Sequence, residues 1–209
     1  SNPAETQNDS FKSVSRYFDR ITRPEQILSS LPQALQVMLD PADCGPATIS
    51  LSQDVQGEAF DYPEIFFEEK IHIIRRIHPD PRQLNEAAEK LKLSKQPIII
   101  AGGGILYSEA EKELSDFAKK HNIPVTPTVM GIGCMTKDDP YYIGAIGCLG
   151  EGSSNSLSKD TDLALAIGTK LGDFTTGSWS NFQNEDFKLV SINTARFDVT
   201  KHLATPVIS

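Results

Sequence analysis

Three consecutive glycines, Gly102–Gly104, come closest in this sequence to a binding motif. They follow the apolar run Pro97–Ala101, and a glycine turn between a strand and a helix is a common phosphate-binding position. The dinucleotide fingerprint G-x-G-x-x-G fails, because Tyr107 occupies the third glycine position and the next strand ends in Thr126–Thr128 without a carboxylate. No G-K-[ST] is present, which excludes a P-loop. Two interpretations remain: a remote relative of a nucleotide-binding loop, or a turn that lets helix and strand pack closely.

Other candidate groups for catalysis lack partners at the required spacing. Gly172-Asp173-Phe174 with Asn193 downstream matches a metal-diphosphate motif incompletely, since the second glycine is absent, and we reject it. Ser153-Ser154 lies near Asp160, but no G-x-S-x-G elbow or base accompanies it. None of the histidines has a cysteine or carboxylate at metal-ligand spacing; they are His72, His78, His121 and His202. The sequence therefore indicates no catalytic residues and no metal site.

A predicted strand–helix–strand unit positions the glycines. Ser108–His121 has apolar residues at helical spacing, with Ser108 as the expected N-cap and Glu111 at the capping-box position. Pro124–Thr126 opens the next strand, and such crossovers are almost always right-handed. The apolar runs 163–167 and 188–192 are typical of further strands buried on both faces. We predict an α/β fold with a parallel sheet, whose C-terminal strand ends form the expected ligand crevice.

The N-terminal part predicts less regular structure. Residues 1–10 are polar and expected to be disordered, with Ser1-Asn2 interpreted as a tag scar. A helix is expected from Pro24 to Asp40, with a kink or second start at Pro32, followed by a strand over Ala47–Leu51. Because no strand is predicted before this helix, the α/β unit is expected to start in its middle. We therefore expect three parts: 1–57, a linker 58–80, and a domain 81–209.

Composition excludes several classes of protein. The formal net charge of −8 argues against a nucleic-acid partner or an acidic membrane surface, which both require a basic face. No apolar run approaches the roughly 20 residues that span a bilayer, and the polar N-terminus has no signal-peptide core. Cys44, Cys134 and Cys148 show no C-x-x-C spacing, which is typical of free thiols. These features predict a cytoplasmic protein.

The order of several blocks resembles the central domain of thiamine-diphosphate enzymes of the acetolactate-synthase type. The blocks are the strand with Gly102–Gly104 and its helix, then Ile123–Val125, Met130–Gly133 and Asp162–Thr169. The likeness covers residues 81–209. It implies a Rossmann-like parallel sheet with helices on both faces, preceded by a helix–strand remnant of a pyrimidine-binding domain.

Three further blocks are similar to one branch of that family, the trihydroxycyclohexanedione hydrolases of myo-inositol breakdown. They are Phe11–Gln26, Leu51–Pro63 and Asp173–Thr176. The resemblance implies a parent enzyme that opens its substrate's ring by hydrolysing a C–C bond, with thiamine diphosphate and a divalent metal, magnesium. It also implies three domains: first a domain that binds the cofactor's pyrimidine, then a central domain, and last a domain that binds its diphosphate.

In this family a glutamate of the first domain activates the cofactor, and a Gly-Asp-Gly…Asn motif of the last domain holds metal and diphosphate. Neither is found here. The resemblance therefore implies a fragment that is structural and inactive alone, with no cofactor bound. Its expected partners are the missing domains of the same chain and further copies in a homo-oligomer. Residues 1–57 are expected to pack on the central domain or to pair with another copy.

Some relatives bind FAD or ADP beside the glycine turn, although the resemblance implies no such ligand for the hydrolase branch. If a nucleotide binds, backbone N–H groups predict its contacts: Gly102, Gly103, Gly104, Gly168 and Thr169. Alternative functions are an acetolactate-synthase-like enzyme and a non-catalytic FAD- or ADP-binding module. A dehydrogenase-like or deacetylase-like domain of the same fold is a third, since fold does not fix function.

Overall fold

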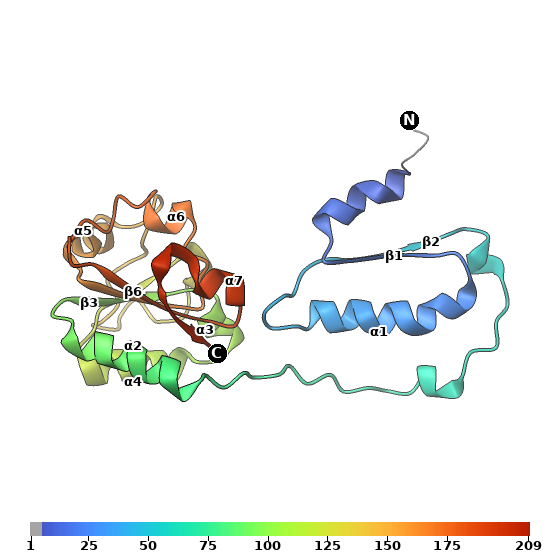
Figure 1. Cartoon of the computed structure of the whole chain (residues 1–209), viewed down its shortest axis with the longest axis horizontal. Helices are drawn as coiled ribbons and strands as arrows, with labels where there is room; N and C mark the ends of the chain where they lie inside the picture. Colours follow the sequence, from blue (N-terminus) through green and yellow to red (C-terminus); the bar gives the residue numbers. More distant parts are fainter. Residues whose placement is uncertain (1–5) are drawn as a thin grey trace. The chain divides into compact units, whose positions relative to one another are not determined.

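The computed structural model describes residues 6–209 and divides the chain into two compact units (Figure 1). The first unit ends at Arg76, and the second comprises Ile77–Ser209. None of the helices formed by the described residues has the length and apolar composition that crossing a membrane requires.

The second unit is built on a five-stranded parallel sheet with the order β4-β3-β5-β6-β7. Strand β3 lies between β4 and β5, and its Ile99 pairs with Val125 of β4 on one side and with Leu165 of β5 on the other. Strands of β-branched and aliphatic residues suit a sheet that is covered on both faces. The strands are β3 (Pro97–Ala101), β4 (Val125–Pro127), β5 (Leu163–Ile167), β6 (Lys188–Asn193) and β7 (Thr205–Ile208).

Helices cover both faces of this sheet. In Figure 1, α2 and α4 lie on one side of the sheet, and α5 and α6 on the other. The alternating side chains of β3 follow this division, because Ile99 belongs to one buried cluster and Ile98 and Ile100 to a second. The predicted Rossmann-like α/β architecture is therefore confirmed. The helices are α2 (Pro81–Leu93), α3 (Gly104–Tyr107), α4 (Glu111–His121), α5 (Gly152–Asp160), α6 (Asp173–Thr176) and α7 (Arg196–Val199).

The start of α4 differs from the prediction. The chain first forms the short helix α3 directly after the glycines, and Ser108 is the residue that ends α3. Glu109 then adopts a left-handed conformation, with φ of 53°, so that α4 begins only at Glu111. Ser108 therefore does not cap the helix. Asn122, with φ of 55°, ends α4 where the sequence predicts the stop.

The first unit contains a complete parallel β-α-β arrangement. Strand β1 (Tyr17–Ile21) pairs in parallel with β2 (Ala47–Leu51), and α1 (Ile27–Met38) connects them after a 3₁₀ turn at Pro24–Gln26. The expectation that no strand precedes the helix is therefore wrong. The reason is Asp19, whose carboxylate accepts a hydrogen bond from the hydroxyl of Ser30 on α1, so that a charged residue interrupts the apolar pattern of the strand.

Two further expectations for the first unit change. A 3₁₀ helix spans Gln7–Val14, so residues 7–10 are ordered, whereas residues 1–5 lie outside the described part. Helix α1 also runs through Pro32 without a second start. The segment after it has little regular structure: beyond the 3₁₀ turn Glu64–Phe66, residues 69–80 form no helix or strand, and residues 67–78 are all exposed.

Candidate functional site

The ligand crevice is predicted at the point where β3 and β5 end side by side. From β3 the chain crosses to β4 on one side, and from β5 it continues to β6 on the other. Open parallel sheets bind ligands at such a reversal of strand order. The structure brings two of the sequence-predicted segments together here, because Gly102–Gly104 follows β3 and Gly168-Thr169 follows β5.

The two glycine segments touch through their backbones. The N–H of Gly102 donates to the carbonyl of Ile167 at 2.8 Å, and that of Gly104 donates to the carbonyl of Gly168 at 3.0 Å. A methyl group on Gly102 would lie 2.2 Å from the Gly168 carbonyl oxygen. Two of the three glycine N–H groups are therefore already used within the protein, and the turn packs loops closely as the second interpretation proposed.

The loop after β4 closes against the same turn. A Cβ atom on Gly131 would lie 2.0 Å from the carbonyl oxygen of Ala101, and one on Gly103 would lie 3.1 Å from the carbonyl oxygen of Met130. The side chain of Thr128 accepts a hydrogen bond from the N–H of Gly131 at 3.2 Å, which fixes this loop. Three neighbouring strands thus end in loops that meet backbone to backbone.

Thr169 is buried, and its hydroxyl and carbonyl both form hydrogen bonds within the protein. Its hydroxyl accepts from the N–H of Leu171 at 3.3 Å, and its carbonyl accepts from the side-chain amide of Asn193 at 3.0 Å. Asn193 ends β6 and also accepts from the N–H of Ala195 at 2.9 Å. Sequence reasoning considered Asn193 only for a metal motif and missed this role, although its position at a strand end was a usable signal.

A second asparagine anchors the loops that follow β4 and β5, and sequence reasoning missed it. Asn155 on α5 bonds both backbone groups of Gly147, accepting from its N–H at 3.0 Å and donating to its carbonyl at 2.9 Å. Its side-chain carbonyl also accepts from the side chain of buried Asn181 at 3.2 Å. Contact of Gly102, Gly103, Gly104, Gly168 and Thr169 with a nucleotide stays a prediction.

Cys134 and Tyr142, in the loop that follows β4, are both held neutral. Burial raises the pKa of the Cys134 thiol to about 11, so it is not a nucleophile at neutral pH. Burial, with the negative charge of Glu151 nearby, also raises the pKa of Tyr142. Neither group is matched to proton transfer near pH 7.

Thiamine diphosphate and magnesium do not fit the residues of this chain. No group of three His, Cys, Asp or Glu side chains within residues 6–209 is arranged to hold a metal ion. Asp173, the acidic residue of the incomplete motif, is exposed on the short helix α6. The glycine turn offers few unused N–H donors for a diphosphate. We therefore derive no chemical step through the cofactor from these residues.

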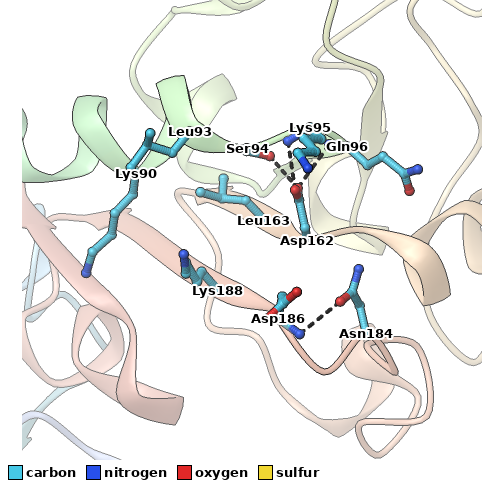
Figure 2. A pocket seen from close by; sticks show the side chains of 10 residues that line it. All are labelled: Lys90, Leu93, Ser94, Lys95, Gln96, Asp162, Leu163, Asn184, Asp186 and Lys188. Atoms are coloured by element: carbon cyan, nitrogen blue, oxygen red, sulfur yellow. Dashed lines mark hydrogen bonds between the residues drawn. The ribbon is translucent and has the colours of Figure 1, made fainter.

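A cavity of about 410 Å³ lies at the opposite edge of the sheet, where β3, β5 and β6 begin (Figure 2). Its central carboxylate, Asp162, accepts from the hydroxyl of Ser94 and from the N–H groups of Lys95 at 2.7 Å and Gln96 at 3.0 Å. Burial acts to raise the pKa of Asp162, but these hydrogen bonds outweigh burial and lower it. Since the oxygens are engaged in joining α2, β3 and β5, this cavity is structural.

Comparison with known proteins agrees with the fold. A sequence model described as "Thiamine pyrophosphate enzyme, central domain" matches residues 84–209, which is more than half of the chain. The chain therefore belongs to the thiamine pyrophosphate enzyme family through its central domain.

The chain is similar to particular members of this class. It is 44% identical over 202 residues to 3D-(3,5/4)-trihydroxycyclohexane-1,2-dione hydrolase 1 of a Bacillus cereus strain, covering 97% of this chain and 31% of the relative. It is also 44% identical over 204 residues to the 3D-(3,5/4)-trihydroxycyclohexane-1,2-dione hydrolase of Clostridium tetani, covering 98% of this chain and 32% of that relative. The chain thus spans about a third of the length of these relatives.

Proposed function

We propose that this chain provides the central domain, and the last β-α-β part of the pyrimidine-binding domain, of a thiamine-diphosphate-dependent hydrolase. That enzyme would open a trihydroxycyclohexanedione ring at a C–C bond during myo-inositol breakdown in the cytoplasm. The observation that carries this proposal is the extent of the similarity: 44% identity runs over 97% of the chain, well beyond the residues of the central domain.

The role assigned to this chain is structural support. The loops of its candidate crevice are joined by backbone hydrogen bonds and close glycine contacts, and burial holds the thiol of Cys134 near them neutral. Thiamine diphosphate and magnesium would be held by other domains of the enzyme. The proposed boundaries are 1–57 for the pyrimidine-binding part, 58–80 for the linker and 81–209 for the central domain.

The partners in this proposal are the pyrimidine-binding and diphosphate-binding domains of the same enzyme, in an assembly of several copies. An FAD- or ADP-binding module is less well supported. A nucleotide phosphate would have to compete for the N–H groups of Gly102 and Gly104, which already donate to protein carbonyls. Helix α3 is also only four residues long, so its dipole contributes little there.

A chimera tests the assignment to this enzyme. The matching segment of the Clostridium tetani hydrolase is replaced by this chain, and ring opening of trihydroxycyclohexanedione is measured with thiamine diphosphate and magnesium. We expect activity within about tenfold of the parent, a change of ~1.4 kcal/mol in the barrier. A folded chimera that binds thiamine diphosphate but does not turn over the dione would contradict the proposal.

Calorimetry tests the structural role. The purified chain is titrated in turn with magnesium thiamine diphosphate, FAD and ADP, and we expect no binding heat from any of them. Tight binding of thiamine diphosphate, or ring-opening activity of the chain alone, would contradict the assigned boundaries. Saturable binding of FAD or ADP that is lost in Gly102→Ala would instead favour the nucleotide-binding module.

A further inference from the structure

Residues Glu68–Arg76, here called the linker segment, expose an unusual amount of apolar surface. The side chains of Ile71 and Ile73 are 87% and 84% exposed, and every residue of the linker segment is exposed. No β-bridge within the described chain involves it. Neighbouring isoleucines left in water mark a surface that another group covers.

The charges of the linker segment are arranged symmetrically about His72. Glu68 and Glu69 precede the isoleucines, and Arg75 and Arg76 follow them. If two copies run antiparallel with the two His72 residues opposite each other, Glu69 of each copy faces Arg75 of the other. In the same register Ile71 faces Ile73. We propose that the linker segments of two copies of this chain pair in this way as antiparallel strands.

The two-residue period of a strand sorts these side chains onto one face. Glu69, Ile71, Ile73 and Arg75 alternate with Lys70, His72 and Ile74, so they point to the same side of an extended chain. The paired face then contains four isoleucines between two ion pairs. Apolar cross-strand pairs and opposite charges stabilise a sheet, and a two-fold symmetric contact uses the same patch twice.

The charges select this register against its alternatives. A parallel pairing in register places Glu69 against Glu69 and Arg75 against Arg75, and like charges opposite each other are destabilising. A shift of two residues in the antiparallel pairing places Glu69 against an isoleucine. Arg75 approaches Asp40 at 3.7 Å in the single chain, but its side chain is 72% exposed, so this long ion pair holds it weakly.

The mixed charge also argues for a second copy over other partners. An anionic partner would face Glu68 and Glu69, and a cationic one would face Lys70, Arg75 and Arg76. Only a surface with the opposite order of charges suits the whole segment, and the segment itself is such a surface when it is reversed. This contact lies outside residues 84–209 and does not depend on the proposed activity.

Charge reversal in single and mixed variants provides the test. Sedimentation velocity of the full chain, up to millimolar concentration, should show twice the mass of one chain. Glu69→Arg and Arg75→Glu each place like charges opposite each other, so each variant alone should raise the dissociation constant at least about tenfold, or ~1.4 kcal/mol. An equimolar mixture of the two variants should dimerise again, because one copy then presents two positive charges and the other two negative charges.

Glu185→Arg is the matched control, since Glu185 is an exposed residue of the second unit. It should leave the dimer unchanged, and the fluorescence of Trp179 should confirm that all variants are folded. A wild-type chain that stays monomeric at millimolar concentration overturns the proposal. So does a dimer that both single variants form as tightly as wild type, or a failure of the mixture to recover.

Discussion

Gly102 and Gly168 meet at the ends of β3 and β5, and neither position has room for a side chain. The space beside Gly102 is filled by the carbonyl of Gly168, which is backbone and has no rotamer to change. Gly168 also has a φ of 61°, a backbone conformation that residues other than glycine rarely adopt. At this scale the glycines keep three loops in contact.

Gly102→Ala tests this packing role. Because the new methyl group would lie 2.2 Å from the Gly168 carbonyl oxygen, the loops must separate. We expect a loss of about 1–3 kcal/mol in the free energy of unfolding, the usual effect of overpacking. Urea unfolding followed through Trp179, the single tryptophan, measures it.

Gly152→Ala is the control, because nothing lies within 4 Å of the added methyl group. Gly152 is the first residue of α5, where alanine is tolerated, so we expect no loss of stability. Equal stability of both variants would show that the crevice loops separate without cost.

At the scale of elements, Asp162 connects the end of α2 to the starts of β3 and β5. One carboxylate receives a hydroxyl and two backbone N–H groups from Ser94, Lys95 and Gln96. These bonds favour the charged form and lower its pKa despite burial. Its stabilising effect is therefore present above the unfolded-state pKa of about 3.9 and is lost as the pH falls through the folded-state value.

Asp162→Asn tests this connection. We expect the variant to lose about 1–3 kcal/mol of unfolding free energy at pH 7, since one oxygen acceptor and the charge are removed. The difference from wild type should shrink below about pH 4, where the carboxylate of the unfolded chain is protonated. Urea unfolding at both pH values measures it.

Asp186→Asn serves as the control, since Asp186 lines the same cavity but is exposed and its carboxylate makes none of the bonds seen at Asp162. We expect a change within about 0.5 kcal/mol at either pH. A stability difference for Asp162→Asn that does not depend on pH would contradict the role of the charge.

The buried elements follow from the sequence, and the polar or locally broken ones do not. Long apolar runs predicted β3, β5 and β6 to within about one residue, because strands covered on both faces are mostly apolar along their length. Strand β1 was missed because the charged Asp19 interrupts its apolar pattern. The hydrogen bond from Ser30 that stabilises this carboxylate cannot be inferred from the sequence pattern. The break at Glu109 was missed too, because local capping rules do not predict a left-handed residue between two short helices.

The meeting of the two glycine segments could be predicted from the sequence, but the bonds between them could not. The glycines after β3 and β5 indicated a crevice at the strand ends, and the structure brings these segments together. Which N–H groups remain available depends on strand register, which sequence alone does not supply. Asn155 and Asn193 were missed for the same reason, because their partners lie 8 and 24 residues away along the chain.

At the scale of the whole molecule, the two units differ in how much apolar surface they bury. In the described part of the first unit the buried residues without a polar side chain are Ile21, Pro24, Ala34 and Val55, around a two-stranded sheet. The second unit has two buried clusters, one on each face of its sheet. Two-stranded sheets are marginal alone, so the first unit should be much the less stable.

Hydrogen exchange followed by mass spectrometry tests this difference. We expect peptides that contain β3, β5 or β6 to exchange far more slowly than peptides that contain β1 or β2. The amides of the first group become accessible only when the larger core of the second unit unfolds. Within each unit, exposed loop peptides provide the fast reference. Equal protection of β2 and β5 would contradict this ranking.

The strand order of the second unit also bears on how the chain is made. Strand β3 emerges first during synthesis, β4 joins one of its edges, β5 joins the other, and β6 and β7 each extend the last edge outward. Among these five strands, none has to insert between two that are already paired. Domains fold as the ribosome releases them, at about 5–20 residues per second. Each new strand can therefore take its final place on arrival, and at any moment only the growing edge and the β4 edge are open to a wrong neighbour.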